Sequence, residues 1–240
     1  MKERLQKVLS RHGVASRRDA ELMIRQGRIS VNGRSVTALG TQADPEADLI
    51  LIDDRPLPPL KPPRILMLNK PVGYLCTQRK SRERGATVFE LIPSDRRYIY
   101  VGRLDRDSSG LLLLTDDGTL AHRLMHPRHS IKKVYRVVTD PPLSQRQIHR
   151  LKAGVDLDDG PACPEQVARI NATQIEITVT EGRNRLIRRM IAAVGSRVIA
   201  LHRLRIGALE LGSLPLGKYE ILDESRVRLL TDNLDNSSID

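Results

Sequence analysis

The stretch Gly102-Arg-Leu-Asp-Arg-Asp-Ser-Ser-Gly-Leu-Leu-Leu-Leu-Thr115 places a charged loop between two apolar segments. Tyr98-Ile-Tyr-Val101 precedes the loop, and Leu111-Leu-Leu-Leu114 follows it. Short apolar runs bounded by turn residues are typical of buried strands, so both segments are predicted to be strands. A loop held between two rigid strands can fix a side chain in place, which makes its carboxylates candidates for a functional role.

The sequence around this loop predicts more strands than helices. Apolar or alternating patterns predict further strands at residues 65–68, 134–138 and 175–179. Helical spacing predicts helices at residues 119–125, 144–151 and 184–194. Because strands and helices do not alternate strictly, the order favours an α+β domain over a doubly wound sheet.

A proline-rich segment, Arg55-Pro-Leu-Pro-Pro-Leu-Lys-Pro-Pro-Arg64, predicts a semi-rigid linker. It separates a small module, residues 1–60, from a larger domain, residues 61–240. The polar end of the chain, from about residue 232, is predicted to be disordered.

The small module contains the pattern of two helices followed by a hairpin. Leu5, Val8 and Leu9 recur at helical spacing, and Ser16 is predicted to cap a second helix that ends near Gly27. Asn32-Gly33 then lies between alternating apolar residues, which is a strong signal for a hairpin turn.

The net charge of +11 and the pI of about 10.1 indicate a polyanionic partner. The charge is segregated, because the first 34 residues are rich in Lys and Arg and most acidic residues of the module come later. The alternative is a solvated basic surface without a partner. Aromatic residues make up only 2% of the chain, so recognition by charge and shape is favoured over stacking of many bases.

Several functional classes are disfavoured by what the sequence contains. Cys76 and Cys163 stand far apart and outside any metal-binding spacing, so neither a zinc site nor a disulfide framework is indicated. The N-terminus has no apolar signal core, and no run of about 18 apolar residues could span a bilayer. A cytoplasmic protein without membrane attachment is the expectation.

The residues alone do not decide the role of Asp105. It is either a functional carboxylate or a turn residue that satisfies local amides, and Asp107, Asp116 and Asp117 are equally available. The segment Asn69-Lys-Pro71 is open in the same way, since it either shapes a site or simply ends a strand at proline.

Four ordered motifs resemble those of the RsuA/RluB family of pseudouridine synthases. They are the stretch from Gly102 to Gly118, Leu68-Asn-Lys-Pro-Val-Gly-Tyr74, Lys133-Val-Tyr-Arg-Val137 and Glu181-Gly-Arg-Asn-Arg-Leu-Ile-Arg-Arg-Met190. The front module is similar to the S4 RNA-binding domain, so the resemblance covers almost the whole chain. It implies a catalytic domain built on a mixed, mainly antiparallel sheet with flanking helices.

The resemblance implies that the chain isomerises a uridine of ribosomal RNA to pseudouridine, without a cofactor or metal. Asp105 falls on the catalytic aspartate, which acts as a nucleophile toward either the sugar or the base. Tyr135 is implied to stack on the base or relay a proton, and Arg188 to form an ion pair with Asp105.

Further residues are predicted to bind the RNA. Around the site these are Arg103, Lys133, Arg183, Arg185, Ile187 and Arg189, and in the small module they are Lys7, Arg11, Arg17, Arg18 and Arg28. Leu186 departs from the family pattern, where Gln or Glu is common, so a polar substrate contact is expected to be missing there.

The local sequence is closer to the RluB branch, which favours large-subunit (23S) ribosomal RNA as the target. The similarity lies in two short segments, Glu181-Gly-Arg-Asn-Arg185 and Leu124-Met-His-Pro127. The alternatives are a small-subunit (16S) enzyme and a non-catalytic RNA-binding assembly factor. The expected partner is ribosomal RNA or a ribosome-assembly intermediate, and the expected state is a monomer.

Overall fold

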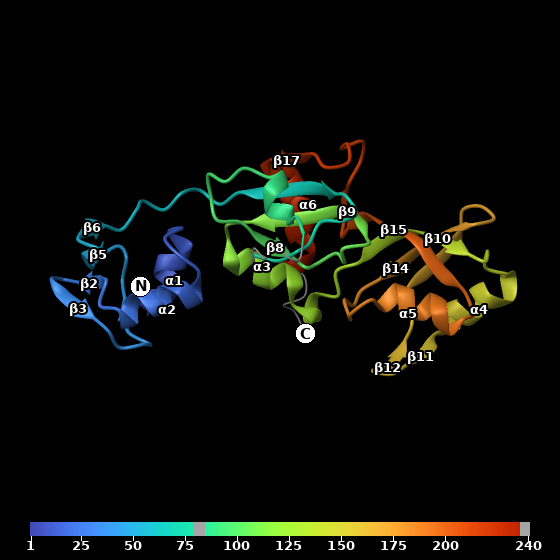
Figure 1. Cartoon of the computed structure of the whole chain (residues 1–240), viewed down its shortest axis with the longest axis horizontal. Coiled ribbons are helices and arrows are strands. Elements are labelled where there is room, and N and C mark those ends of the chain that lie inside the picture. The colour runs from blue at the N-terminus through green and yellow to red at the C-terminus, as the bar shows by residue number, and fades with distance from the viewer. Residues whose placement is uncertain (79–84, 236–240) are drawn as a thin grey trace. The chain divides into compact units, whose positions relative to one another are not determined.

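The computed structural model describes residues 1–78 and 85–235 and divides into two compact units. The first contains Met1–Pro63 together with the short segments Asp95–Arg97 and Asp116–Gly118. The second contains the remaining described residues. Figure 1 shows the helices and strands of each unit with their labels.

The first unit has two helices followed by a small antiparallel sheet, as the sequence predicts. Ser16 caps the second helix by accepting a hydrogen bond from the backbone N–H of Asp19. Asn32 and Gly33 both have positive φ, 52° and 77°, which is the geometry of a tight hairpin turn. The elements are β1 (Glu3–Arg4), α1 (Leu5–Arg11), α2 (Arg17–Arg25), β2 (Ile29–Val31), β3 (Arg34–Val36), β4 (Gln42–Ala43), β5 (Ile50–Ile52) and β6 (Arg55–Pro56).

The start of the predicted linker is part of this sheet. Strand β6 pairs with β5 at the outer edge of the order β3-β2-β5-β6. An edge strand can accept Pro56 because the missing N–H need not pair with a neighbour. The linker prediction is therefore wrong for Arg55 and Pro56, whereas residues 57–64 have no regular structure.

The second unit is built on a nine-stranded sheet. Its main path runs β13-β14-β10-β15-β9-β7-β17, with β16 paired to β15 and β8 to β9. The β9–β15 pair is parallel and the other pairs are antiparallel, so the predicted α+β class with a mixed, mainly antiparallel sheet is confirmed. The strands are β7 (Ile65–Lys70), β8 (Ile99–Val101), β9 (Ser109–Thr115), β10 (Lys133–Asp140), β13 (Gln166–Arg169), β14 (Gln174–Val179), β15 (Arg197–Ile206), β16 (Leu209–Glu210) and β17 (Tyr219–Ile221).

The continuous leucine run arises because β9 is buried on both faces. Leu112 and Leu114 belong to one hydrophobic core, while Leu111 and Leu113 belong to a second one. Successive side chains of a strand point to opposite faces, so a strand between two cores has no polar alternation. The charged loop before β9 is thus anchored to the most buried part of the sheet.

Helices cover this sheet in two groups (Figure 1). Residues of α4 and α5 contribute to the first core, and residues of α3 and α6 contribute to the second. The three predicted helices are confirmed. The bounds are α3 (Gly118–Met125), α4 (Gln145–Ala153), α5 (Leu186–Ala193) and α6 (Glu224–Asp235), with a separate hairpin of β11 (Val155–Leu157) and β12 (Gly160–Ala162) and 3-10 turns at Val88–Leu91 and Pro127–His129.

The C-terminal helix differs from the sequence prediction. Residues 232–235, predicted to be disordered, continue α6, whose earlier residues Val227 and Leu230 pack on the second core. Such packing can extend a helix into a polar segment that has no apolar signal of its own. Residues 236–240 lie outside the described part. In the described residues, no helix is both long and apolar enough to cross a membrane.

Candidate active site

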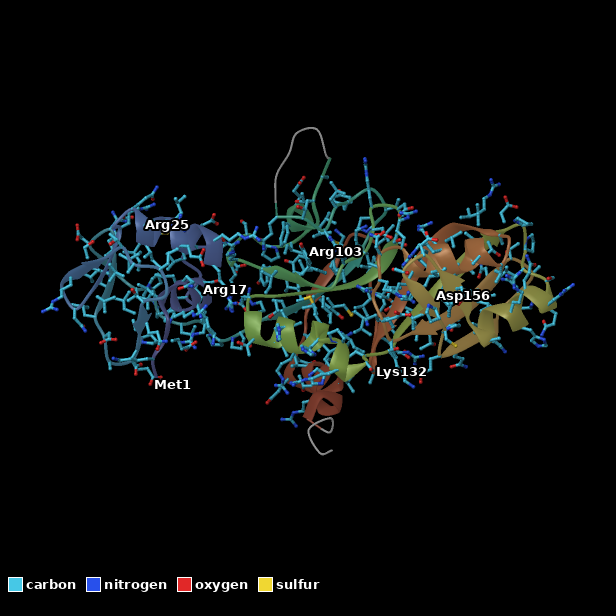
Figure 2. The ribbon with its side chains drawn as sticks, turned by 90° about the horizontal axis from the view of Figure 1, so that it is seen from below. Met1, Arg17, Arg25, Arg103, Lys132 and Asp156 are labelled. Carbon is cyan, nitrogen blue, oxygen red and sulfur yellow. The ribbon has the colours of Figure 1, made fainter. Side chains whose placement is uncertain are left out.

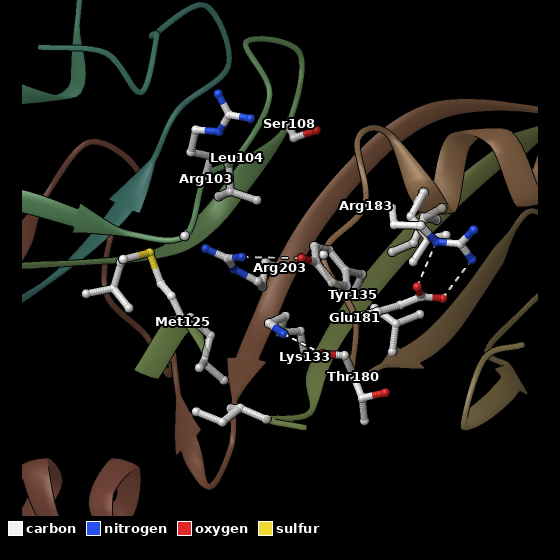
Figure 3. Close-up of a pocket in the computed structure, with 18 of the residues that line it drawn as sticks. Arg103, Leu104, Ser108, Met125, Lys133, Tyr135, Thr180, Glu181, Arg183 and Arg203 are labelled. Carbon is white, nitrogen blue, oxygen red and sulfur yellow. Dashed lines mark hydrogen bonds and ion pairs between the residues drawn. The ribbon is translucent and has the colours of Figure 1, made fainter. Parts of the chain in front are cut away.

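An open cavity of about 830 Å³ lies in the second unit, lined by several segments of the chain (Figure 3). These are the loop between β8 and β9, residues between 124 and 131 around the end of α3, parts of β10 and β15, and residues 179–187, which lead from β14 into α5. The structure brings most of the predicted site residues together here: Arg103, Asp105, Lys133, Tyr135, Arg183, Arg185 and Ile187 all line the cavity. Neither Arg188 nor Arg189 is among the described residues that line the cavity.

Asp105 lies at the mouth of the cavity on the β8–β9 loop. Its side chain is 34% exposed, and its Oδ2 lies 3.9 Å from Nη1 of Arg185. Its backbone carbonyl accepts a hydrogen bond from the N–H of Ser108 at 3.1 Å, which closes a tight turn. The carboxylate therefore faces an open space, while the backbone that carries it is fixed.

Lys70 is the buried group that holds this loop. It ends β7, its side chain has no exposed surface, and its Nζ donates to the carbonyl oxygens of Pro71 at 3.1 Å, Asp105 at 3.0 Å and Ser108 at 2.7 Å. Burial lowers the pKa of this ammonium group, and the nearby Asp105 and Asp107 partly oppose that shift. Of the two interpretations of Asn69-Lys-Pro71, the structure supports the one in which the segment shapes the site.

Replacing Lys70 with Met is expected to loosen the loop without removing any group from the cavity. The three carbonyl oxygens lose their donor, so the free energy of unfolding should fall by about 1–3 kcal/mol. Activity should fall by about 100-fold because the carboxylate is no longer positioned. Chemical denaturation and single-turnover assays measure the two effects, and a variant with wild-type activity would show that Lys70 does not position the loop.

Arg188 does not form the predicted ion pair with Asp105. Its Nη2 donates to the carbonyl oxygen of Asp107 at 2.9 Å and lies 3.2 Å from the Asp107 carboxylate. Nη1 also donates to the carbonyl of Val198 on β15, at 3.3 Å, and this second anchor keeps the guanidinium at the base of the turn. Arg188 thus stabilises the backbone beyond Asp105, and Arg185 is the cation that pairs with the Asp105 carboxylate.

Asp107 connects the loop to the start of α5. Its carboxylate pairs with both Arg185 and Arg188 at 3.2 Å. Burial raises the pKa of Asp107, but the hydrogen bond from Arg185 and the charges of both arginines outweigh it, so the pKa lies below its usual value. No local signal in the sequence separates this structural carboxylate from Asp105.

Tyr135 lies on β10 with 8% of its surface exposed and lines the cavity. Its register partner on β15 is Arg203, whose Nη1 donates to the Tyr135 hydroxyl at 3.3 Å. The guanidinium carbon lies 5.8 Å from the centre of the ring, within the range of a cation–π contact. Figure 3 shows the two side chains joined in this way.

Lys133 supplies a second cation to the cavity, two residues before Tyr135. Its Nζ donates to the carbonyl oxygen of Thr180 at 2.8 Å. Burial and, to a smaller extent, the charge of Arg203 lower the pKa of Lys133 to about 8, although Glu181 opposes the shift. The group is therefore mostly charged at neutral pH in a place where the charge is unfavourable.

Replacing Lys133 with Met is expected to raise the free energy of unfolding near neutral pH by about 1 kcal/mol, after allowance for partial exposure and the lost hydrogen bond. The pKa of Lys133 falls from 10.5 to about 8 on folding, so between these values the unfolded chain binds more protons and stability rises with pH. Denaturation at about pH 7 and about pH 10 tests this, because the advantage of the variant should disappear at the higher value. An advantage that does not change with pH would contradict it.

Arg183 and Arg189 are held by the turn between β11 and β12. The Asp159 carboxylate accepts from Arg183 at 2.9 Å and from Arg189 at 2.8 and 2.9 Å, and Arg183 also pairs with Glu181. Both arginines thus have acidic partners in the chain itself. The sequence indicates a turn at Asp159-Gly160, but it does not indicate which cations the turn would contact.

Two further cavity residues named from the sequence are both apolar and buried. Ile187 is 4% exposed and forms part of the apolar wall. Leu186 is 5% exposed and also lines the cavity, so an apolar side chain stands at the position where the family commonly has a polar one. Across the described residues, no group of three or more His, Cys, Asp and Glu side chains is arranged to hold a metal ion.

The cations of the first unit are partly neutralised within that unit. Lys7 and Arg11 both pair with Glu3, and Arg28 forms a two-point contact with Asp53. The excess of positive charge is therefore smaller in the fold than along the chain, because Glu3 lies beside two of these cations and Asp53, from the later acidic segment, lies beside Arg28. Arg17 and Arg18 are exposed at the start of α2, and Figure 2 shows Arg17 and Arg25 on this helix.

Comparisons with known proteins agree with this geometry. Residues 64–193 match the RNA pseudouridylate synthase family, and residues 3–49 match the S4 domain. An RNA pseudouridine synthase of Aquifex aeolicus is 40% identical over 96% of this chain and 94% of its own length. The ribosomal large subunit pseudouridine synthase B of Pasteurella multocida is 42% identical over 95% of this chain and 69% of its own length.

A solved structure gives the same result for the fold. The crystal structure of a pseudouridylate synthase superposes with a TM-score of 0.69 at 32% identity, over 95% of this chain and 99% of the other. The sequence motifs, the cavity around Asp105 and these relatives lead to one conclusion. The chain belongs to the RNA pseudouridylate synthase family, with an S4 domain in front of the synthase domain.

Proposed function

We propose that this enzyme converts one specific uridine of large-subunit ribosomal RNA to pseudouridine, with the Asp105 carboxylate as nucleophile. The observation that carries the proposal is the position of Asp105, which is fixed through its backbone by Lys70 while its carboxylate faces the cavity. The choice of large-subunit RNA rests on the relatives named ribosomal large subunit pseudouridine synthase B, among them that of Pasteurella multocida.

The reaction detaches uracil from C1′ of its ribose and reattaches it through C5, without net oxidation. An ionised carboxylate suits this chemistry because it can add covalently to the substrate and leave again. Tyr135 presents an aromatic ring and a hydroxyl to the same cavity, which supports roles in stacking on the base and relaying a proton. The apolar wall that contains Ile187 encloses the base beside them.

The target uridine has to leave its helical stack to reach Asp105. Flipping a nucleotide costs about a few kcal/mol, which phosphate contacts can offset. Arg103 is exposed at the rim of the cavity and suits such a contact, together with Arg17 and Arg18 of the first unit. We further propose that the enzyme acts as a monomer in the cytoplasm on ribosomal RNA or on a ribosome-assembly intermediate.

Pseudouridine mapping in a strain that lacks the gene tests this function. We expect one modified position of 23S ribosomal RNA to become unmodified and to be restored by the wild-type gene. The purified enzyme should also modify that position in a transcript. Loss of a 16S position instead would show that the subunit is wrong, and an unchanged map together with an inactive purified protein would favour a non-catalytic assembly factor.

A further inference from the structure

Arg203 is a buried cation that lines the cavity, and one of its nitrogens has no hydrogen-bond partner among the described residues. The residue lies on β15 and is 3% exposed. Its Nε donates to the carbonyl oxygen of Leu111 at 2.7 Å, and Nη1 donates to the hydroxyl of Tyr135 at 3.3 Å. Nη2 is buried, and no described residue accepts a hydrogen bond from it.

An unpartnered charged donor in this position is unfavourable for the free protein. Buried N–H groups are nearly always paired, and a buried guanidinium is normally matched by an anion. Arg203 is instead accompanied by a second cation, Lys133, which lines the same cavity and whose pKa burial lowers to about 8. Donors fixed in advance in a site closed to water are typical of groups that stabilise charge appearing during a reaction.

The proposed reaction produces such a charge on the uracil. Attack at C1′ joins an Asp105 oxygen to C1′ and breaks the N1–C1′ bond, and the electron pair stays on the uracil, spread over N1, O2 and O4. Attack at C6 instead moves the electrons of the C5=C6 bond onto O4. Both routes place negative charge on a carbonyl oxygen. When C5 later bonds to C1′, the bond from C1′ to the Asp105 oxygen or to N1 breaks. H5 then leaves as a proton and N1 takes up a proton, which leaves the ring neutral. On the C6 route the Asp105 oxygen also leaves C6 as H5 departs.

Resting on the function proposed above, we propose that Arg203 is a catalytic residue that donates a hydrogen bond from Nη2 to a carbonyl oxygen of the flipped uracil and stabilises its negative charge. Its contacts with Leu111 and Tyr135 hold the guanidinium in one orientation, so that Nη2 remains for the substrate. A guanidinium suits this task because its donors form a rigid planar fork and it stays charged at all relevant pH values.

The contact forms only when the base enters. Nη2 is closed off from solvent in the free chain, so side chains of the cavity wall have to move before a carbonyl oxygen can reach it. Leu104 and Met125 line the same cavity, and Met is an adaptable side chain that can repack. Figure 3 shows both of them in the wall around the guanidinium.

The competing explanation is that Arg203 only holds β9 and Tyr135 in place. A substrate with one altered atom distinguishes this explanation from the proposal. Single-turnover rates are measured on an RNA that carries the target uridine, 2-thiouridine or 4-thiouridine, because sulfur is a weak hydrogen-bond acceptor. The proteins compared are the wild type, Arg203→Met and the control Arg205→Met. Arg205 is on the same strand but forms an exposed ion pair with Glu210 at 3.1 Å.

We expect sulfur at one of the two positions to slow the wild type and Arg205→Met by about 10- to 100-fold, since a hydrogen bond to a charged donor is lost. Arg203→Met should be slower on ordinary uridine by about 100-fold or more. The same sulfur substitution should then reduce the single-turnover rate of this variant by less than about threefold. If Arg203→Met does not fold, Arg203→Lys is used in the same comparison, and the sulfur penalty should again shrink.

Equal sulfur penalties in the wild type and the Arg203 variant at both positions, or no penalty in the wild type at either, would overturn the proposal. The result is distinguishable from failure of the proposed function. If the wild type forms no pseudouridine on the ordinary uridine, the function itself is wrong. If the wild type is active but the sulfur penalty is the same in the Arg203 variant, only the role of Arg203 is wrong.

Discussion

Replacing Asp105 with Asn is expected to reduce pseudouridine formation by about 10⁴-fold or more, because an amide cannot act as the nucleophile. The fold should not change. The Asp105 side chain is 34% exposed and has one ion pair, at 3.9 Å from Arg185, so its charge contributes little to stability. The backbone contacts that shape the loop come from Lys70, Ser108 and Arg188 and do not involve the Asp105 carboxylate.

Product formation on the target RNA and the affinity for the same RNA are measured together for this variant. Affinity should stay within about threefold, since phosphate contacts by cations dominate binding. Asp107→Asn is the matched control, because it removes a carboxylate two residues away that pairs with Arg185 and Arg188. It should reduce the rate by about tenfold through loop mobility alone. An active Asp105→Asn beside an inactive Asp107→Asn would reverse the two roles.

Replacing Gly110 with Ala is expected to lower the free energy of unfolding of the second unit by about 4 kcal/mol or more. An added Cβ would lie 2.3 Å from the carbonyl oxygen and 2.5 Å from the nitrogen of Arg203, both of which are backbone atoms. Gly110 also has φ of +105°, which an alanine adopts only with strain. This position is where β9 pairs with β15 in parallel, so the collision separates two central strands of the sheet.

Chemical denaturation measures the effect, and Gly217→Ala provides the control for backbone strain alone. Gly217 has φ of +77°, and within the described residues a Cβ there would meet nothing within 4 Å. Its replacement should cost about 1–2 kcal/mol. If the two variants were equally stable, the close approach of β9 and β15 would not be the reason for glycine at position 110.

The local patterns of the sequence were sufficient for the elements around the charged loop and for the first unit's helices and hairpin, but they did not predict β15. The strands before and after Asp105, the helix capped by Ser16 and the Asn32-Gly33 turn were all predicted correctly. Each depends on side-chain periodicity or on the backbone preference of one or two residues, which neighbouring residues determine. The end of the chain was less clear, because α6 extends to Asp235 through packing on the core rather than through a pattern of its own.

The sequence also led to the family and to most of the residues around the cavity, although the choice of Asp105 over Asp107 needed the resemblance. Both are carboxylates of one short loop, and spacing does not separate them. In the structure they differ: Asp105 lines the cavity, whereas Asp107 pairs with two arginines at the base of the turn. Arg188 is a similar case. The resemblance implied an ion pair with Asp105, whereas in the structure Arg188 pairs with Asp107.

The sequence by itself therefore determined the elements around the charged loop, the fold class and the family of this protein. The tertiary structure decided where strands such as β15 lie and which side chains contact one another. Lys70 reaches Asp105 across 35 residues, and Arg203 reaches Leu111 across 92. A buried lysine at a strand end and an arginine in an alternating strand give no local sign of their partners. Such contacts depend on how β7, β9, β10 and β15 are arranged in one sheet, and that arrangement is fixed by packing between distant segments rather than by the preferences of neighbouring residues.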